Sequence, residues 1–260
     1  MAALLTIKGL SVRFGGLQAL DSLDLEAPAG AITALIGPNG AGKTTAINCV
    51  SGVVAPNSGQ VGFDGRAVLG MAGYKLARLG LTRTFQNLQV FGLMNVLENV
   101  MVGMHAASRG GFAAAMLRLP LLRRQEAAIR ARAEEVLAFF GLDKVAHQPA
   151  EELAYGDQKR LELARALAGR PRLMLLDEPV AGLNAAETHE LGRLIVKIKE
   201  QGIGVVLVEH DMGLVMRISD QVAVLSGGRL IARGTPAQIQ QDPEVIRIYL
   251  GGGEEFGLLA

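Results

Sequence analysis

Gly37-Pro38-Asn39-Gly40-Ala41-Gly42-Lys43-Thr44 follows directly on the short apolar run Ile32-Thr33-Ala34-Leu35-Ile36. Glycines allow backbone N–H groups to turn toward an anion without a Cβ in the way. A helix after the loop adds free N–H groups and the positive end of its dipole. In such a loop Lys43 reaches the terminal phosphates and the Thr44 hydroxyl binds Mg²⁺. The stretch therefore predicts a buried strand, a phosphate-binding loop and a helix, and a chain that binds a nucleoside triphosphate.

Length and composition limit the classes of protein that fit. The 260 residues suit one large domain, or one domain with an insertion, and half of them are apolar. The net charge of +1, from 26 basic and 25 acidic residues, gives no support for a nucleic-acid partner or an anionic membrane surface. The single cysteine, Cys49, gives no disulfide framework and agrees with a reducing cytosol.

The sequence also lacks the usual marks of membrane insertion. Its first residues have neither the basic start nor the long apolar run of a signal peptide. No segment offers the roughly 18 uninterrupted apolar residues that suggest a membrane span. We therefore expect a soluble chain that reaches a membrane only through a partner.

Periodicity divides the chain into three kinds of segment. Alternating apolar residues at 10–14, 17–25 and 61–63, with a turn at Gly15-Gly16, predict N-terminal antiparallel strands. Apolar strands are expected at 81–85, 173–176, 203–208, 222–225 and 230–232, and helices at 158–168, 186–201 and from Pro243. Strands that alternate with helices of this length favour a parallel sheet and an α/β fold.

A helical segment interrupts this α/β pattern. From Asn87 to Ala150 the apolar residues recur at helical spacing, as in Val96, Val100 and Met104, and Gly141 fits a helix end. We therefore expect a discontinuous core of residues 1–86 and 154–250, an inserted helical subdomain of residues 87–153, and a flexible tail of residues 251–260.

Charged and polar residues follow several of the expected strands. Asp177 and Glu178 follow the apolar run 173–176, where ligands bind in open α/β sheets. Asp177 could hold Mg²⁺, and Glu178 could polarise a water for attack on the γ-phosphate. His210 ends another apolar strand and could contact the same phosphate. A single histidine is more often structural, and Gln86 at the end of the run 81–85 is uninformative alone for the same reason.

The order of these pieces resembles the ATP-binding-cassette (ABC) ATPases over nearly the whole chain. The phosphate loop, Gln86 before the helical insertion, Asp177-Glu178 and His210 occur in that family's order. Leu153-Ala154-Tyr155-Gly156-Asp157 stands at the place of the family signature, usually written L-S-G-G-Q. A GTPase fits less well, because the chain has no Asn-Lys pair for a guanine-binding N-K-x-D motif.

The resemblance implies a P-loop NTPase cassette with a mixed sheet, an N-terminal antiparallel β subdomain and an inserted helical subdomain. It implies ATP and Mg²⁺ as ligands. The residues implied for ATP are Phe14, Gly37, Pro38, Asn39, Gly40, Ala41, Gly42, Lys43, Thr44 and Thr45. Those for catalysis are Glu178, His210 and Gln86, and those for Mg²⁺ are Thr44, Gln86 and Asp177. Phe14 would stack on adenine, although a phenylalanine at the edge of the core is the alternative.

The signature residues Ala154, Tyr155, Gly156 and Asp157 would face the ATP of a second ATPase subunit, so that two subunits enclose two nucleotides. Three positions depart from the family pattern. Ala154 replaces the signature serine, Asp157 replaces the glutamine, and Asn184 replaces the aspartate of the loop usually written S-A-L-D. These changes leave the contacts across the dimer less well specified than ATP binding itself.

Further residues are similar to one subgroup, the larger ATPase subunit (LivG type) of the branched-chain, hydrophobic amino-acid importers. They include Ala181-Gly182-Leu183-Asn184, Glu209-His210-Asp211-Met212 and Tyr249-Leu250-Gly251. The resemblance implies a peripheral ATPase at the cytoplasmic face of the inner membrane. Its partners would be a second ATPase subunit in a heterodimer or homodimer, two membrane permeases and, indirectly, an extracytoplasmic solute-binding protein.

Other functions stay open. They are the ATPase of a urea or amide importer or of a lipopolysaccharide exporter, a cassette protein that acts on ribosomes or DNA, and a regulatory subunit that binds ATP without turnover. Cassette proteins outside transport commonly fuse two cassettes or insert a coiled coil, and this sequence has neither feature. Permease and binding-protein genes beside this one would separate transport from the other functions.

Replacing Lys43 by alanine is expected to weaken ATP binding by about 1.5–3 kcal/mol, because a bound phosphate loses a charge-assisted hydrogen bond. Titration of the purified variant with nucleotide measures the change, with Lys8→Ala, outside the loop, as the control. Near-normal affinity in Lys43→Ala would remove the phosphate-loop assignment.

Overall fold

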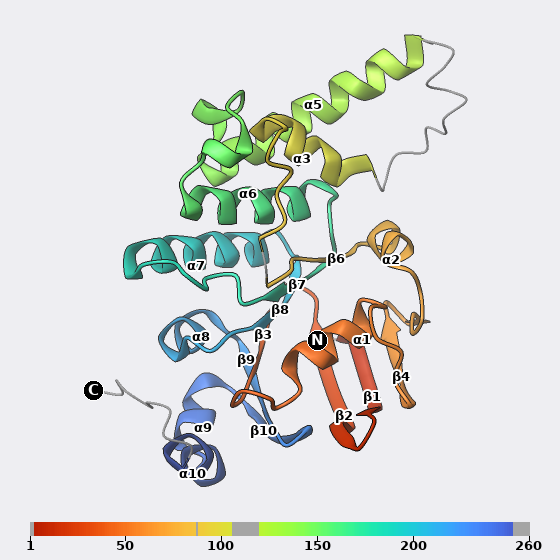
Figure 1. Cartoon of the computed structure of the whole chain (residues 1–260), viewed down its shortest axis with the longest axis vertical. Helices are drawn as coiled ribbons and strands as arrows, with labels where there is room; N and C mark the ends of the chain where they lie inside the picture. Colours follow the sequence, from red (N-terminus) through yellow and green to blue (C-terminus); the bar gives the residue numbers. More distant parts are fainter. Residues whose placement is uncertain (1–2, 87, 106–119, 252–260) are drawn as a thin grey trace.

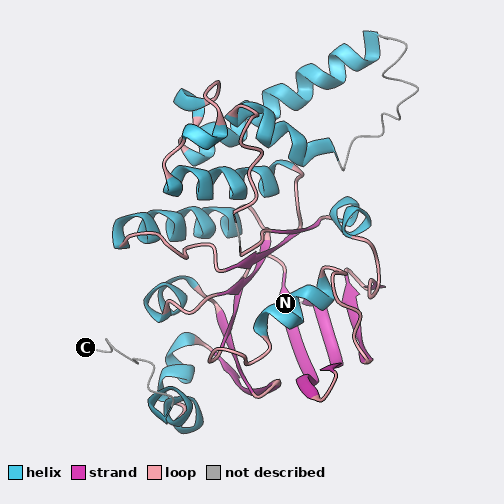
Figure 2. Ribbon diagram, in the orientation of Figure 1, coloured by secondary structure: helices cyan, strands magenta, loops and turns pink. Residues whose placement is uncertain are grey.

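The computed structural model describes residues 3–86, 88–105 and 120–251. The tail expected at residues 251–260 lies outside the described residues except for Gly251, which ends a helix rather than starting the tail. Most of the segment between Ser108 and Arg124 lies outside them as well, as does Asn87. The described chain forms a central sheet, a second sheet beside it, and a group of helices at one end (Figure 1; Figure 2).

The central sheet has six strands in the order β10-β9-β3-β8-β7-β6. The strands are β3 (Ile32–Ile36), β6 (Leu81–Arg83), β7 (Leu173–Asp177), β8 (Gly204–Val208), β9 (Gln221–Ser226) and β10 (Arg229–Gly234). All neighbours pair in parallel except β10, which is antiparallel to β9. This confirms the α/β fold with a mixed sheet. Every residue of β3, β7 and β8 is buried, as expected for parallel strands covered on both faces.

A four-stranded antiparallel sheet, ordered β2-β1-β4-β5, covers one face of the central sheet together with helix α1. Its strands are β1 (Ala3–Phe14), β2 (Leu17–Pro28), β4 (Ser58–Phe63) and β5 (Arg66–Ala67), and α1 spans Lys43–Val50. Leu35 and Val206 of the central sheet share a core with Leu5 and Phe63 of the antiparallel sheet. Cys49 in α1 packs in this core as a small apolar side chain. Its burial raises the pKa of the thiol to about 11, so the thiol stays protonated.

Helices cover the opposite face of the central sheet. They are α7 (Ala185–Glu200), α8 (Met212–Ile218), α9 (Pro236–Gln241) and α10 (Pro243–Gly251), and a further short helix, α2 (Gly73–Leu79), precedes β6. Ile36 and Val224 pack against Val215 of α8 and Val245 of α10. The sequence predicted α7 and α10 but not α2, α8 or α9, which are too short to show a helical period.

The helical lobe is formed by α3 (Val96–His105), α5 (Pro120–Phe140) and α6 (Tyr155–Ala168), with two 3₁₀ turns at Asp143–Val145 and Ala150–Glu152. Val96, Val100 and Met104 are buried on one stripe, as predicted, and pack with Phe140. Gly141 ends α5 with a left-handed φ of +70°. Helix α6 packs against both α3 and α5 (Figure 1), so the packed helical unit continues past residue 153. The division into subdomains at that residue stays a prediction.

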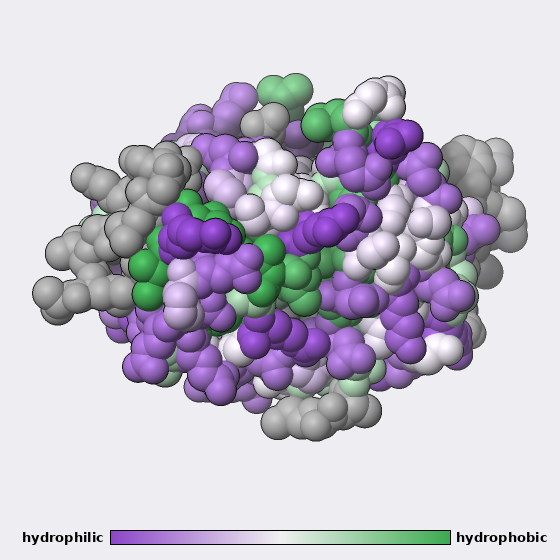
Figure 3. Space-filling model, turned by 90° about the horizontal axis from the view of Figure 1, so that it is seen from below, coloured by the Kyte–Doolittle hydropathy of each residue, from purple (hydrophilic) through white to green (hydrophobic). Residues whose placement is uncertain are grey.

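Hydrophobic residues come to the surface in small separate areas on the end of the molecule shown in Figure 3, and hydrophilic residues cover most of that face. Within the described ranges, no helix combines the length and apolar character needed to cross a membrane.

Candidate functional site

The phosphate loop lies between β3 and α1, as predicted from the sequence. Gly37, Gly40 and Gly42 have φ angles of +150°, +79° and +105°, which side-chain-bearing residues rarely adopt. A Cβ on Gly37 would overlap the carbonyl oxygen of Leu225, and one on Gly42 would lie 2.5 Å from the carbonyl oxygen of Ala19. Neighbouring backbone therefore excludes side chains at Gly37 and Gly42, and the loop keeps its curved path.

Lys43 points back across the loop. Its ammonium donates to the carbonyl oxygens of Gly37 at 2.6 Å and Pro38 at 3.0 Å, and the residue is only 8% exposed. This places the positive charge inside the curve of the loop, where a phosphate would meet it. Thr44 and Thr45 follow in the first turn of α1.

Phe14 lies at the end of β1, beside the Gly15-Gly16 turn, and is 51% exposed. The residue is therefore not enclosed in the core, which favours the stacking interpretation over the structural one. Its contact with adenine stays a prediction.

The sheet brings the other predicted residues to one edge. Asp177 pairs with Val208, Leu35 also pairs with Val208, and Arg83 pairs with Leu175. The carboxyl ends of β3, β8, β7 and β6 therefore lie side by side, with the phosphate loop, His210, Glu178 and Gln86 following them. Such an edge is the usual ligand site of an open parallel sheet.

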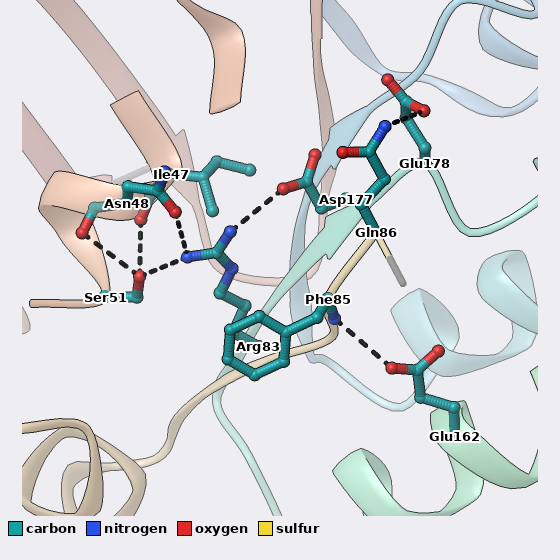
Figure 4. Close-up of polar contacts among 9 residues, drawn as sticks. All are labelled: Ile47, Asn48, Ser51, Arg83, Phe85, Gln86, Glu162, Asp177 and Glu178. Carbon is teal, nitrogen blue, oxygen red and sulfur yellow. Dashed lines mark hydrogen bonds and ion pairs between the residues drawn. The ribbon is translucent and has the colours of Figure 1, made fainter. Parts of the chain in front are cut away.

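Glu178 and Gln86 contact each other directly. The Gln86 side-chain amide donates to a carboxylate oxygen of Glu178 at 3.0 Å (Figure 4). Glu178 has a left-handed φ of +49°, and its N–H donates to the carbonyl oxygen of Val208 at 2.9 Å. The side chain of His210 is 64% exposed. The catalytic roles of these three residues stay predictions.

Asp177 fits a magnesium ligand. The residue is 1% exposed, and one carboxylate oxygen, Oδ2, accepts from Arg83 at 3.1 Å. The other oxygen, Oδ1, is buried and has no hydrogen-bond partner among the described residues. Burial raises the pKa of Asp177, whereas the Arg83 guanidinium opposes that rise. A buried anionic oxygen with a free lone pair, close to the Thr44 helix, suits a hard cation such as Mg²⁺.

Two charged residues outside the predicted set of site residues support this edge. Arg83 is one of them. Glu209, which is 0% exposed, is the other: it accepts from the N–H of Val180 at 3.0 Å and from the N–H of His210 at 3.1 Å. Burial raises the pKa of Glu209, and these N–H groups oppose that rise. In the sequence, Arg83 lies within an expected strand and Glu209 directly follows one. A charged residue at such a position was the available signal for each of them.

The signature residues begin α6. Ala154 is its exposed N-cap residue, and Tyr155 is 46% exposed. The Tyr155 hydroxyl donates to the carbonyl oxygen of Ala181 at 3.2 Å, and its ring lies against Gly182. The signature loop therefore contacts the loop that follows Glu178 in the same chain.

Gly156 is buried, and a Cβ there would lie 2.8 Å from the Glu187 carboxylate. A side chain at this position would therefore displace the Glu187 carboxylate of the same chain. Glu187 and Asn184 form a capping box at the start of α7, in which the Asn184 side chain accepts from the Glu187 N–H at 3.0 Å. Asparagine and aspartate cap helices about equally well, so the departure at Asn184 has a local explanation. Asp157 pairs with Arg160 at 3.2 Å.

A family model described as ABC transporter matches residues 20–181, a range that includes the phosphate loop, the signature and Asp177-Glu178. The chain belongs to the ABC transporter family. A second model, described as Branched-chain amino acid ATP-binding cassette transporter, matches residues 229–255. The resemblance seen in the sequence is thereby confirmed, and the chain is an ABC ATPase.

Individual ABC relatives match over almost their full length. The high-affinity branched-chain amino acid transport ATP-binding proteins BraF of Pseudomonas aeruginosa and LivG of Escherichia coli are each 44% identical over 249 residues, which cover 95% of this chain and 98% of the relative. The lipopolysaccharide export system ATP-binding protein LptB of Escherichia coli is 32% identical over 256 residues, or 98% of this chain and 100% of the relative.

Solved structures agree with the fold. The ADP conformation of an ATP-binding cassette of an ABC transporter has a TM-score of 0.84 and 29% identity, covering 96% of this chain and 100% of that one. A nucleotide-free cassette has a TM-score of 0.83 and 28% identity, covering 95% and 99%. Nucleotide binding is therefore a property of the family to which the chain belongs.

Replacing Glu209 by alanine is expected to lower the free energy of unfolding, because two buried N–H groups lose their acceptor at about 1–3 kcal/mol each. Glu209→Gln, which keeps one acceptor oxygen, should lose less. Urea unfolding followed by circular dichroism measures both. The control is Glu135→Ala, whose side chain is 67% exposed. Equal midpoints for Glu209→Ala and Glu135→Ala would show that the buried carboxylate does not support this edge.

Proposed function

We propose that this chain is the ATP-hydrolysing subunit of an importer for branched-chain amino acids. The observation that carries the proposal is the 44% identity to BraF and LivG over 95% of the chain, together with the C-terminal model at residues 229–255. The lipopolysaccharide exporter subunit LptB is less similar, at 32% identity, and that export function is the alternative. A urea or amide importer is the other alternative within transport.

The residues of the sheet edge would divide the hydrolysis between them. Lys43 and the loop N–H groups would bind the β- and γ-phosphates of ATP. The Glu178 carboxylate would take a proton from the attacking water, and Gln86, at 3.0 Å from it, would orient that carboxylate. His210 would contact the γ-phosphate. When bound by Thr44, Asp177 and Gln86, Mg²⁺ would neutralise charge on the phosphates.

A second ATPase subunit would complete the site. Ala154 and Tyr155 are exposed at the start of α6, and the dipole of that helix favours an anion beyond its N-terminus. These features support a head-to-tail pair of ATPase subunits in which α6 of one faces the nucleotide of the other. The second subunit in this head-to-tail pair would be either another copy of this chain or a related ATPase chain.

A groove between α2 and the helical lobe would receive a membrane permease. It has a volume of about 670 Å³, and Arg83, Phe85, Phe91, Glu162 and Arg165 are among its lining residues. Phe91 is 48% exposed and Leu93 is 93% exposed, whereas Val90 packs partly into the lobe core. We therefore place the docking contacts at the exposed residues Phe91 and Leu93. Two permeases would hold the ATPase at the cytoplasmic face of the inner membrane, with a solute-binding protein on the opposite side.

Glu178→Gln is expected to bind Mg·ATP but to hydrolyse it about 10²–10⁴-fold more slowly, because a positioned general base is lost. In cells that express the chain with its permeases and binding protein, the same variant should stop the uptake of radiolabelled leucine. Uptake of urea but not leucine by the wild-type complex would favour the urea importer. Unchanged ATPase turnover in Glu178→Gln would reassign the water-activating role.

Leu93→Glu is expected to uncouple the ATPase from the permeases, because a charge replaces an exposed apolar side chain two residues after Phe91, which lines the groove. Leucine uptake should fall, while the isolated subunit keeps its basal ATPase rate and melting temperature. Ala128→Glu, on an exposed position of α5, is the matched control. Normal uptake by Leu93→Glu would place the docking surface elsewhere.

A further inference from the structure

We propose that Arg83 is a positioning residue for the magnesium site, which sets the Asp177 carboxylate and joins it both to helix α1 and to the groove beside the helical lobe. The inference rests on the proposed function, since it concerns the metal that Asp177 and Thr44 would share. It adds a residue that lies outside the phosphate loop, the signature and the predicted catalytic set.

The guanidinium of Arg83 has two ends that reach different elements (Figure 4). One terminal nitrogen, Nη1, donates to the side-chain oxygens of Asn48 and Ser51, each at 2.7 Å. The other, Nη2, pairs with Asp177 Oδ2 at 3.1 Å, and the Arg83 and Asp177 side chains are only 8% and 1% exposed. A buried, forked donor of this kind fixes the orientation of both partners, which a single ammonium cannot do.

The two elements joined by Arg83 are those that would supply the metal ligands. Helix α1 carries Thr44 in its first turn and Asn48 in its second, while Asp177 ends β7. Arg83 therefore fixes the position of α1 relative to Asp177. Since Mg²⁺ demands near-ideal octahedral geometry, a shift between these two elements weakens its binding.

The carboxylate of Asp177 is also oriented by this contact. Arg83 occupies Oδ2, and Oδ1 is the buried oxygen that no described residue contacts. Without the guanidinium, the buried carboxylate would lose its hydrogen-bond donor, and the charge of Lys43 alone would oppose the like charge of Glu178. The pair thus leaves one oxygen in a defined direction for the cation, as outer-shell partners of metal ligands do.

Arg83 also reaches the groove. Its guanidinium lies 4.8 Å from the centre of the Phe85 ring, and both residues line the groove. Phe85 is 45% exposed, and its N–H donates to Glu162 of α6 at 3.4 Å. A permease segment that presses on the Phe85 ring would therefore move the guanidinium that holds Asp177. This connection is separate from the Gln86–Glu178 contact.

The test measures the affinity of the full-length chain for ADP, by titration calorimetry, at increasing Mg²⁺ and in EDTA. Arg83→Met should raise the apparent Kd for Mg²⁺ by about 10–100-fold, the effect of losing an outer-shell partner. Its ADP affinity in EDTA should stay within about two-fold of wild type, and Arg83→Lys, which keeps the charge but not the fork, should fall between. Phe85→Ala should shift the Mg²⁺ dependence in the same direction by less.

Several results would overturn the inference. One is an unchanged Mg²⁺ dependence in Arg83→Met. Another is an equal loss of ADP affinity with and without Mg²⁺, which would show that Arg83 only supports the fold. Wild-type Mg²⁺ dependence in Phe85→Ala would remove the connection to the groove. If wild-type protein bound ADP without regard to Mg²⁺, the proposed metal site itself would fail instead.

A folding control keeps the test decisive. Thermal unfolding of each variant shows whether it is folded under the conditions of the titration. If Arg83→Met does not fold, Asn48→Ala removes only one hydrogen bond between Arg83 and α1, and should weaken Mg²⁺ binding by a smaller factor. No change in Asn48→Ala would then count against the inference.

Discussion

The parallel pairing of β3, β8, β7 and β6 is the constraint on which the rest of the molecule depends. Parallel strands are stable here because α1 and the antiparallel sheet cover one face, and α7 and α8 cover the other. Their alignment brings the phosphate loop, His210, Asp177-Glu178 and Gln86 to one edge, although these residues are up to 173 positions apart in the sequence, from Gly37 to His210. A change in strand order would separate Gln86 from Glu178 and Arg83 from Asp177, because each pair joins β6 or its following residues to β7 or its following residues.

Much of this arrangement could be predicted from the sequence. The glycine-rich loop after an apolar strand, the strands at 173–176 and 203–208, and the helical stripe at Val96, Val100 and Met104 are local patterns, and burial enforces each of them. The pairing of Gln86 with Glu178 could not be predicted, because it depends on β6 lying next to β7. A local pattern in the sequence predicts where a strand ends, but it does not predict which strand lies beside it in the sheet.

The same limit explains the residues that were missed. The sequence assigned no role to Arg83 or Glu209, and their importance comes from the groups that surround them in the folded chain. Both are buried charged groups, which are costly to bury without partners, and both connect one strand end to another segment. Most of their polar atoms are hydrogen-bonded, while Arg83 Nε has no partner among the described residues. Buried polar groups at this edge therefore make its geometry stiff, in contrast to the exposed ion pairs of α5, which contribute little.

The membership of α6 in the packed helical lobe has a mechanical consequence. Its first residues are exposed and, in the proposed pair of subunits, would face the partner, whereas Glu162, two turns along, accepts a hydrogen bond from the backbone of Phe85 at the groove. Near the first end, Tyr155 and Gly156 rest on Gly182 and Glu187, which belong to the loop and helix after Glu178. A displacement of Phe85 at the groove would therefore reach α6 through Glu162. The contacts of Tyr155 and Gly156 with Gly182 and Glu187 would then limit how far the start of the helix can move relative to the loop after Glu178.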